Sequence, residues 1–85
     1  MLTFENIYGK LLDIMTEEGM AKIIAGDTTM VLIKDRQALL GGQEDIYFGY
    51  DKDNNHYRYT SLIDFMHRFL SQYIKNKLKV KVSKV

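Results

Sequence analysis

The chain has 85 residues, of which 46% are hydrophobic and 27% are charged, a composition typical of a folded globular protein rather than a disordered one. A chain of this length can build one modest core, so we expect a single domain over residues 1–85, whose marginal stability a homodimer would supplement. The lack of cysteine excludes disulfides, thiolate zinc sites and a cysteine nucleophile.

The net charge of +1 conceals two halves of opposite sign. Residues 1–45 carry four basic and eight acidic side chains, a net of −4, whereas residues 46–85 carry eight basic and three acidic ones, a net of +5. Such polarity can attract a charged partner, or draw the two halves of the fold together. Because no basic, apolar leader and no apolar run near the roughly 18 residues of a membrane span are present, we expect a cytoplasmic protein with no membrane contact.

A first helix is predicted from Thr3, its N-cap, to about Thr16. Leu2 and Ile7 are spaced for a hydrophobic staple, and Gly19 is the natural stop. The expected buried stripe consists of Phe4, Ile7, Tyr8, Leu11, Leu12 and Met15.

Residues 20–25 allow two interpretations. Met20, Ile23 and Ile24 continue the helical spacing, so the helix could run through Gly19 at a cost of about 1 kcal/mol. The alternative, which we favour, is a hairpin that pairs residues 21–25 with residues 28–34 around a type II′ turn at Gly26-Asp27. In both cases residues 28–33 are β-branched and apolar enough for a central, mostly buried strand.

Charged residues 34–36 indicate the exit from that strand. Residues 38–40 then form a short strand or tuck under the sheet, and Gly41-Gly42 breaks the chain. Residues 46–50 and 56–59 are predicted strands, joined by a turn over residues 51–55.

The clearest helix signal runs from Ser61 to Lys77, with Ser61 and Asp64 spaced as a capping box. Residues 78–83 then alternate apolar residues with lysine or serine, which predicts an edge strand with lysines on its outer face. The expected helical stripe consists of Leu62, Phe65, Met66, Phe69, Leu70, Tyr73 and Ile74.

These elements predict an α+β fold of the order α-β-β-(β)-β-β-α-β. Two helices would pack on one face of a small antiparallel sheet, because each helix carries one apolar stripe that needs a surface opposite it.

No catalytic, cofactor or metal motif is present, so we expect neither an enzyme nor a cofactor. The oxygen ligands of Asp51, Asp53 and Asn55 resemble the start of a calcium loop, but His56 and Leu62 stand where that motif needs glycine and glutamate. A solvated turn is the favoured interpretation. Neither His56 nor His67 has a second ligand at a useful spacing.

A lysine-rich end and aromatic strands are features of nucleic-acid binders, so nucleic-acid binding is the alternative function. Its candidate residues are Lys75, Lys77, Lys79 and Lys81, with Arg58. The order helix, sheet, helix loosely resembles the double-stranded RNA-binding domain. However, the last helix begins SLIDFM and lacks the basic start of that family.

The leading hypothesis is a non-enzymatic binding or regulatory module that contacts an unidentified protein, because interfaces are enriched in tyrosine, arginine and methionine. The expected contacts lie on the predicted hairpin and the last helix: Tyr47, Tyr50, Tyr57, Arg58, His67 and Arg68. A bias toward Lys, Ile, Asn and Tyr resembles the small proteins of AT-rich bacteria and their phages. This resemblance implies a phage or mobile-element accessory protein that binds a host protein.

Overall fold

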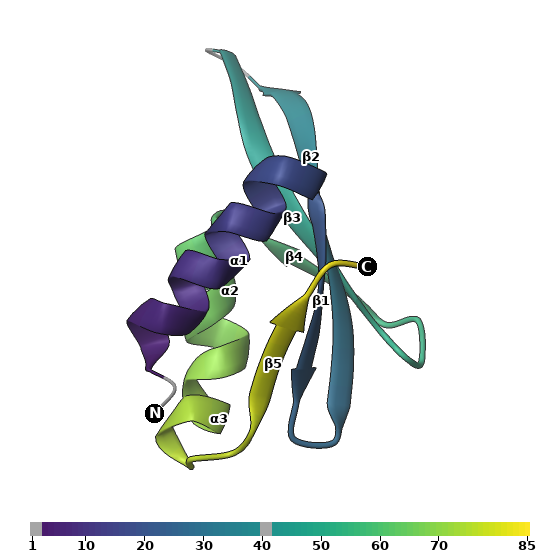
Figure 1. The fold of residues 1–85 in the computed structure, drawn as a ribbon. Helices are drawn as coiled ribbons and strands as arrows, with labels where there is room; N and C mark the ends of the chain where they lie inside the picture. The colour runs from purple at the N-terminus through teal and green to yellow at the C-terminus, as the bar shows by residue number, and fades with distance from the viewer. Residues whose placement is uncertain (1–2, 40–41) are drawn as a thin grey trace.

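The computed structural model describes residues 3–39 and 42–85. Its five strands form one antiparallel sheet in the order β4-β3-β2-β1-β5, and the helices lie against one face of this sheet (Figure 1). The predicted α+β class is thus confirmed. In chain order the elements are α1 (Phe4–Glu18), β1 (Met20–Ala25), β2 (Thr28–Leu39), β3 (Gly42–Asp51), β4 (His56–Tyr59), α2 (Leu62–Phe65), the π-helical turn η1 (Met66–Leu70), α3 (Ser71–Lys75) and β5 (Val80–Ser83).

Helix α1 has the predicted start and stop. The Thr3 hydroxyl accepts a hydrogen bond from the Asn6 N–H at 3.2 Å, and Gly19 ends the helix with a φ of 74°. The predicted stripe is wrong at Leu12, which is 40% exposed, whereas Ile14 is buried. The helix is rotated slightly from the expected phase, so that Ile7, Leu11 and Ile14 face the core. The staple between Leu2 and Ile7 falls outside the described residues.

Residues 20–25 are a strand and not a continuation of the helix. β1 pairs antiparallel with β2 in the predicted hairpin, and Gly26 has the left-handed φ of 58° that a primed turn needs at its first position. The Gly26 N–H also donates to the carbonyl oxygen of Lys79 at 2.9 Å, which fixes the turn to the chain entering β5. β2 is the central strand of the sheet, as predicted.

The predicted end of the central strand at residues 34–36 is wrong. β2 continues to Leu39, so residues 38–39 belong to it and form no separate strand, and Leu40 lies outside the described residues. The strand continues because β3 pairs with it in register as far as Leu39 and Gly42, with an ion pair between Arg36 Nε and Asp45 Oδ1 at 3.3 Å. Residues 35–39 and 42–46 project beyond the sheet as a two-stranded arm (Figure 1).

The second helical segment combines α2, η1 and α3. The Ser61 hydroxyl accepts from the Asp64 N–H at 3.0 Å as predicted, while the Asp64 carboxylate accepts from the N–H of Thr60 instead of Ser61. The π-helical turn was not predicted. The segment ends at Lys75, two residues earlier than expected, because Lys77 adopts a left-handed φ of 58° and the Leu78 N–H donates to the carbonyl of Tyr73.

One apolar core lies between the helices and the sheet. Strand β5 is an edge strand as predicted, with Val80 and Val82 buried and Lys81 exposed. The predicted start at residue 78 is wrong, since β5 begins at Val80 and Leu78 is 48% exposed. No described helix is long and apolar enough to span a membrane. The covered face of the sheet carries the side chains that meet the helices: Ala21, Ile23, Ala25, Met30, Leu32, Tyr47, Tyr59, Val80 and Val82.

Candidate binding surfaces

The face of the sheet turned away from the helices, the open face, is apolar at its centre. Strand alternation and the pairing register place two rows of neighbours across it, and no described helix covers them. The first row is Met20, Ile33, Phe48 and Arg58, and the second is Lys22, Val31, Tyr50 and His56. Met20 is 37% exposed, and Val31, Ile33, Phe48 and Tyr50 are half-buried.

Two of the predicted contact residues, Tyr50 and Arg58, belong to this open face. The Tyr50 ring meets His56 edge-on, with 4.7 Å between the ring centroids. By strand alternation, Ile46 also belongs to the open face. It is only 3% exposed, although it lies outside the core cluster beneath the helices. Burial along β3 on the open face is therefore uneven, because Ile46 is buried whereas Phe48 and Tyr50 are only half-buried.

Tyr47 and Tyr57 lie on the opposite side of the sheet from Tyr50. Tyr47 is half-buried and packs against the core, and burial, with the charge of Asp45 as a smaller cause, raises its pKa. Tyr57 is 39% exposed, and its hydroxyl donates to Asp51 Oδ2 at 3.2 Å, which raises the tyrosine pKa. The structure thus does not gather the predicted tyrosines on one surface.

The predicted helix contacts, His67 and Arg68, lie on the exposed side of η1 and touch neighbouring elements. The His67 ring is 5.2 Å from the Phe4 ring at the start of α1. Arg68 donates to the Arg58 carbonyl at 3.0 Å and to Asp64 Oδ2 at 3.2 Å, and its guanidinium lies 5.1 Å from the centre of the Tyr59 ring. Arg68 therefore joins the second helical segment to β4.

The turn after β3 is organised by one carboxylate. Asp51 Oδ1 accepts from the N–H groups of Asp53 and Asn55 at 2.9 and 3.0 Å, and Oδ2 accepts from the Asn55 side chain and the Tyr57 hydroxyl. The bonds from Asn55 are the main reason why the pKa of Asp51 is lowered. In the described residues, no group of three or more histidines and carboxylates could hold a metal ion.

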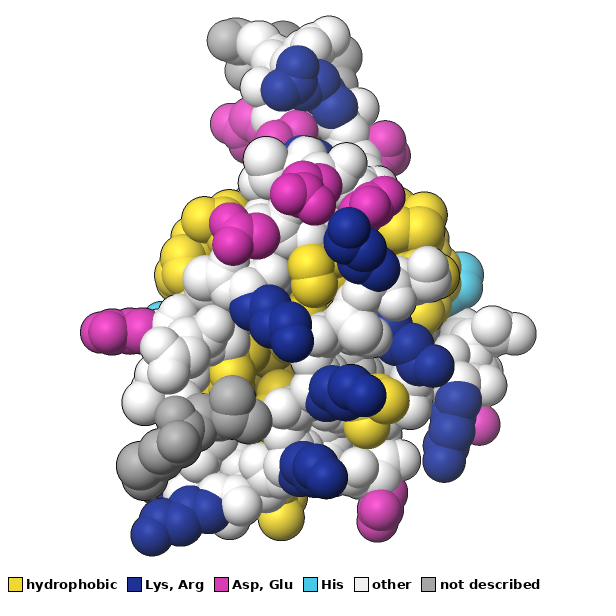
Figure 2. Space-filling view, in the orientation of Figure 1, with side chains coloured by type: hydrophobic (Ala, Val, Ile, Leu, Met, Phe, Trp, Pro, Cys, Tyr) yellow, Lys and Arg dark blue, Asp and Glu magenta, His cyan; other side chains and the backbone are white. Residues whose placement is uncertain are grey.

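Basic side chains gather over the lower half of the face shown in Figure 2, and acidic ones gather nearer its upper end. Lys75, Lys77, Lys79 and Lys81, the candidate nucleic-acid ligands, are all exposed. Lys84 instead pairs with Glu17 and Glu18 at 3.6 and 3.4 Å, which raises the lysine pKa. Part of the charge asymmetry is therefore neutralised within the fold.

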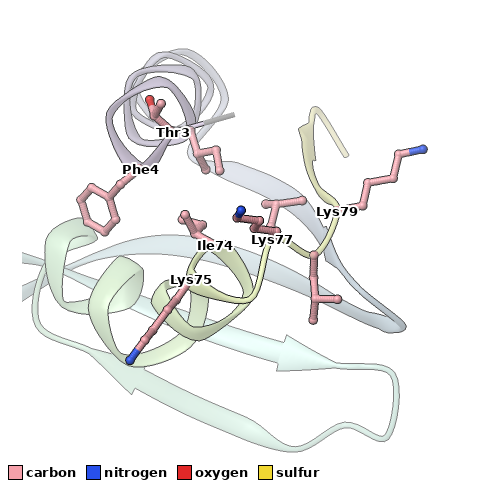
Figure 3. Close-up of a pocket in the computed structure, with 9 residues that line it drawn as sticks. Thr3, Phe4, Ile74, Lys75, Lys77 and Lys79 are labelled. Atoms are coloured by element: carbon pink, nitrogen blue, oxygen red, sulfur yellow. The ribbon is translucent and has the colours of Figure 1, made fainter. Parts of the chain in front are cut away.

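A cavity of about 600 Å³ opens where the start of α1, the end of α3 and the chain entering β5 meet (Figure 3). Sequence reasoning missed this cavity, because its lining comes from both ends of the chain. Its lining residues are Thr3, Phe4, Ile7, Ile74, Lys75, Lys77, Leu78, Lys79 and Val80.

No protein-family model, no curated protein and no solved structure matches this chain. No match therefore supports the loose resemblance to the double-stranded RNA-binding domain, and the functional argument rests on the surfaces described above.

Proposed function

We propose that the protein is a non-enzymatic binding module that contacts another protein through the open face of its sheet. The observation that carries this proposal is the apolar row of Met20, Ile33 and Phe48 on a face that no described helix covers. An antiparallel sheet with one solvated face usually alternates polar residues onto that face. An apolar face rimmed by polar residues is instead typical of an interaction site.

The rim of this patch has the residue types that anchor protein interfaces. Tyr50 and Arg58 flank Phe48, and tyrosine and arginine are the residues whose truncation most often weakens a complex. The arm adds a second means of contact, because β4 pairs with β3 only at residues 47–50. The outer edge of β3 over residues 42–46 therefore offers backbone groups to which a partner strand can pair.

The proposal is tested by capture from a bacterial lysate with three immobilised baits: wild type, Phe48→Thr and Leu12→Gln. Threonine keeps the strand propensity while removing the ring, and Leu12 is a matched control because it is an exposed apolar side chain on the outer side of α1. Circular dichroism verifies that each bait is folded. We expect one protein that wild type and Leu12→Gln recover and Phe48→Thr loses, with equal recovery from nuclease-treated lysate.

If the Phe48→Thr bait still recovers the partner protein, the open face is not the contact surface. Sedimentation equilibrium of the purified protein examines the other occupant, a second copy of this chain. A dimer that Phe48→Thr dissociates would assign the open face to self-association and overturn the proposal of a different protein partner.

Nucleic-acid binding remains a second candidate, supported by the exposure of Lys75, Lys77, Lys79 and Lys81 within seven acid-free residues. This function predicts that affinity for an oligonucleotide falls with salt, with a logarithmic slope of about 0.7–0.9 for each phosphate contacted. Phe48→Thr should leave that affinity unchanged, whereas replacing the four lysines with glutamine should abolish it. Capture that collapses on nuclease treatment would favour this candidate over protein binding.

A further inference from the structure

The cavity at the end of α3, the lysine-rimmed cavity, combines an apolar lining with basic side chains, and none of the described residues that line it is acidic. Lys75, Lys77 and Lys79 contribute three positive charges. Figure 3 shows Lys75 and Lys79 reaching outward on opposite sides, with Lys77 between them and Phe4 facing Ile74. The apolar part of the lining consists of Phe4, Ile7, Ile74, Leu78 and Val80.

Backbone hydrogen bonds hold the open side of this cavity in place. The left-handed Lys77 turns the chain out of α3, with the Leu78 N–H bound to the Tyr73 carbonyl at 2.9 Å. The Lys79 carbonyl in turn accepts from the Gly26 N–H at 2.9 Å, so the link into β5 is tied to the β1–β2 turn. Leu78, which lines the cavity, is 48% exposed, although it is a large apolar residue.

We propose that the lysine-rimmed cavity binds a single-chain alkyl phosphate, with the alkyl chain against the apolar lining and the phosphate at the mouth, where the flexible lysine side chains turn inward to reach it. The volume lies within the range of about 300–1,000 Å³ that is typical of small-molecule sites. An apolar lining favours an alkyl chain, and burial of that chain removes apolar surface from water. Ammonium groups bind phosphate as point charges, so lysines on flexible stems can close on a head group at the mouth.

This site is separate from the open face proposed to contact a protein, although three of its lysines are also the candidate nucleic-acid ligands. The cavity lies at the lower end of the helix layer, whereas Phe48 and Ile33 lie on the open face of the sheet. Lys81 offers a matched control, because it alternates with the buried Val80 and Val82 on β5 and does not line the cavity. A negative result here therefore leaves the capture experiment unaffected.

Isothermal titration calorimetry with the full chain tests the proposal, using decyl phosphate below its micelle concentration. Inorganic phosphate and decyltrimethylammonium serve as probes for the head group alone and for a cationic amphiphile. We expect saturable binding of one decyl phosphate per chain and no binding of the other two probes. The paired substitution of Lys77→Asn and Lys79→Gln should weaken binding at least about tenfold, because two charge-assisted contacts are lost.

Leu78→Ser should also weaken decyl phosphate binding, whereas Lys81→Gln should leave it unchanged. Equal weakening by Lys81→Gln would show a diffuse basic surface and overturn the proposal. Binding of inorganic phosphate as tightly as decyl phosphate would overturn the role of the apolar lining. Failure to bind monomeric decyl phosphate, with binding only to vesicles of anionic lipid, would assign the lysines to a membrane surface instead.

Discussion

The two faces of the sheet are made by the same strands but have opposite relations to the rest of the chain. On the covered face, Ala21, Ile23, Ala25 and Leu32 have no exposed surface, because the helices close over them. On the open face, Val31, Ile33 and Phe48 alternate with those residues along the same strands and stay half-buried. Both faces are apolar at their centre, yet the described helices cover only one of them.

This difference shows how the covered face is fitted to its helices. Gly49 lies opposite Leu32, and a Cβ at this position would stand 2.7 Å from the Met30 sulfur and 3.2 Å from the Tyr59 ring. The glycine therefore makes room for two large side chains over β3. On the open face, no described helix closes over the half-buried side chains of Ile33 and Phe48, and such an apolar surface is one that a partner can complete.

The largest expected effect compares adjacent residues on the two faces. Leu32→Ala should cost about 2–5 kcal/mol, because it leaves a cavity in a fully buried site, whereas Ile33→Ala should cost about 1 kcal/mol or less on the half-exposed side. Urea denaturation of both variants measures the difference. Equal losses would show that the open face is already covered in the isolated protein, as in a dimer.

Adding volume to the covered face, instead of removing it, also tests how closely this face is packed. Gly49→Ala should destabilise the fold by about 1–3 kcal/mol, since Met30 and Tyr59 must move away from the new methyl group. Gly9→Ala is the matched control: it lies inside α1 with nothing within 4 Å of the added Cβ, and it should stabilise by about 0.5–1 kcal/mol. A neutral Gly49→Ala in thermal or urea unfolding would contradict the fit.

Many of the helix ends and turns around the covered face were predictable from short sequence patterns. Thr3 and Ser61 start their helices, Gly19 ends α1, and Gly26 turns the first hairpin, and each of these signals acts within four residues. The alternation of residues 80–83 likewise indicated an edge strand before its partner was known. Period and capping are properties of short segments, so one sequence is enough to recognise them.

The features that sequence reasoning missed depend on distant residues. Charged residues 34–36 suggested the end of a strand, but Arg36 meets Asp45 across the arm and the strand continues. No local sequence pattern predicted the π-helical turn η1. Most of the candidate surface residues were missed for the same reason. Only Tyr50 and Arg58 of the open face were among the predicted contacts, since its first row draws on four strands, and the lysine-rimmed cavity joins Phe4 to Leu78.

A smaller effect concerns the link between the covering helices and β5. Lys77→Gly should stabilise the fold by about 0.5–1 kcal/mol, because glycine adopts the left-handed φ of 58° without the steric cost of a side chain. Lys75→Gly removes the same charge inside the last turn of α3 and should instead destabilise by about 0.5–1 kcal/mol. Thermal unfolding distinguishes the two, and a loss of stability in both would mean that the lysine charge outweighs the backbone conformation.

The smallest expected effect is at Asp51. Its pairing with Met30 places it on the covered face, but its hydrogen-bond partners come from the turn and not from a helix. Its folded pKa is below the ordinary value of 3.8, so its contribution to stability is complete above that value and is lost as the pH falls through the lowered pKa. Asp51→Asn should therefore flatten the decline of the urea midpoint between about pH 5 and pH 2. Tyr57→Phe removes one of the four bonds to the carboxylate and should flatten it less. If the urea midpoint of Asp51→Asn falls with pH as steeply as that of wild type, the Asp51 carboxylate does not stabilise the turn. The turn at the exposed end of β3 would then be held by its backbone alone, without support from either face of the sheet.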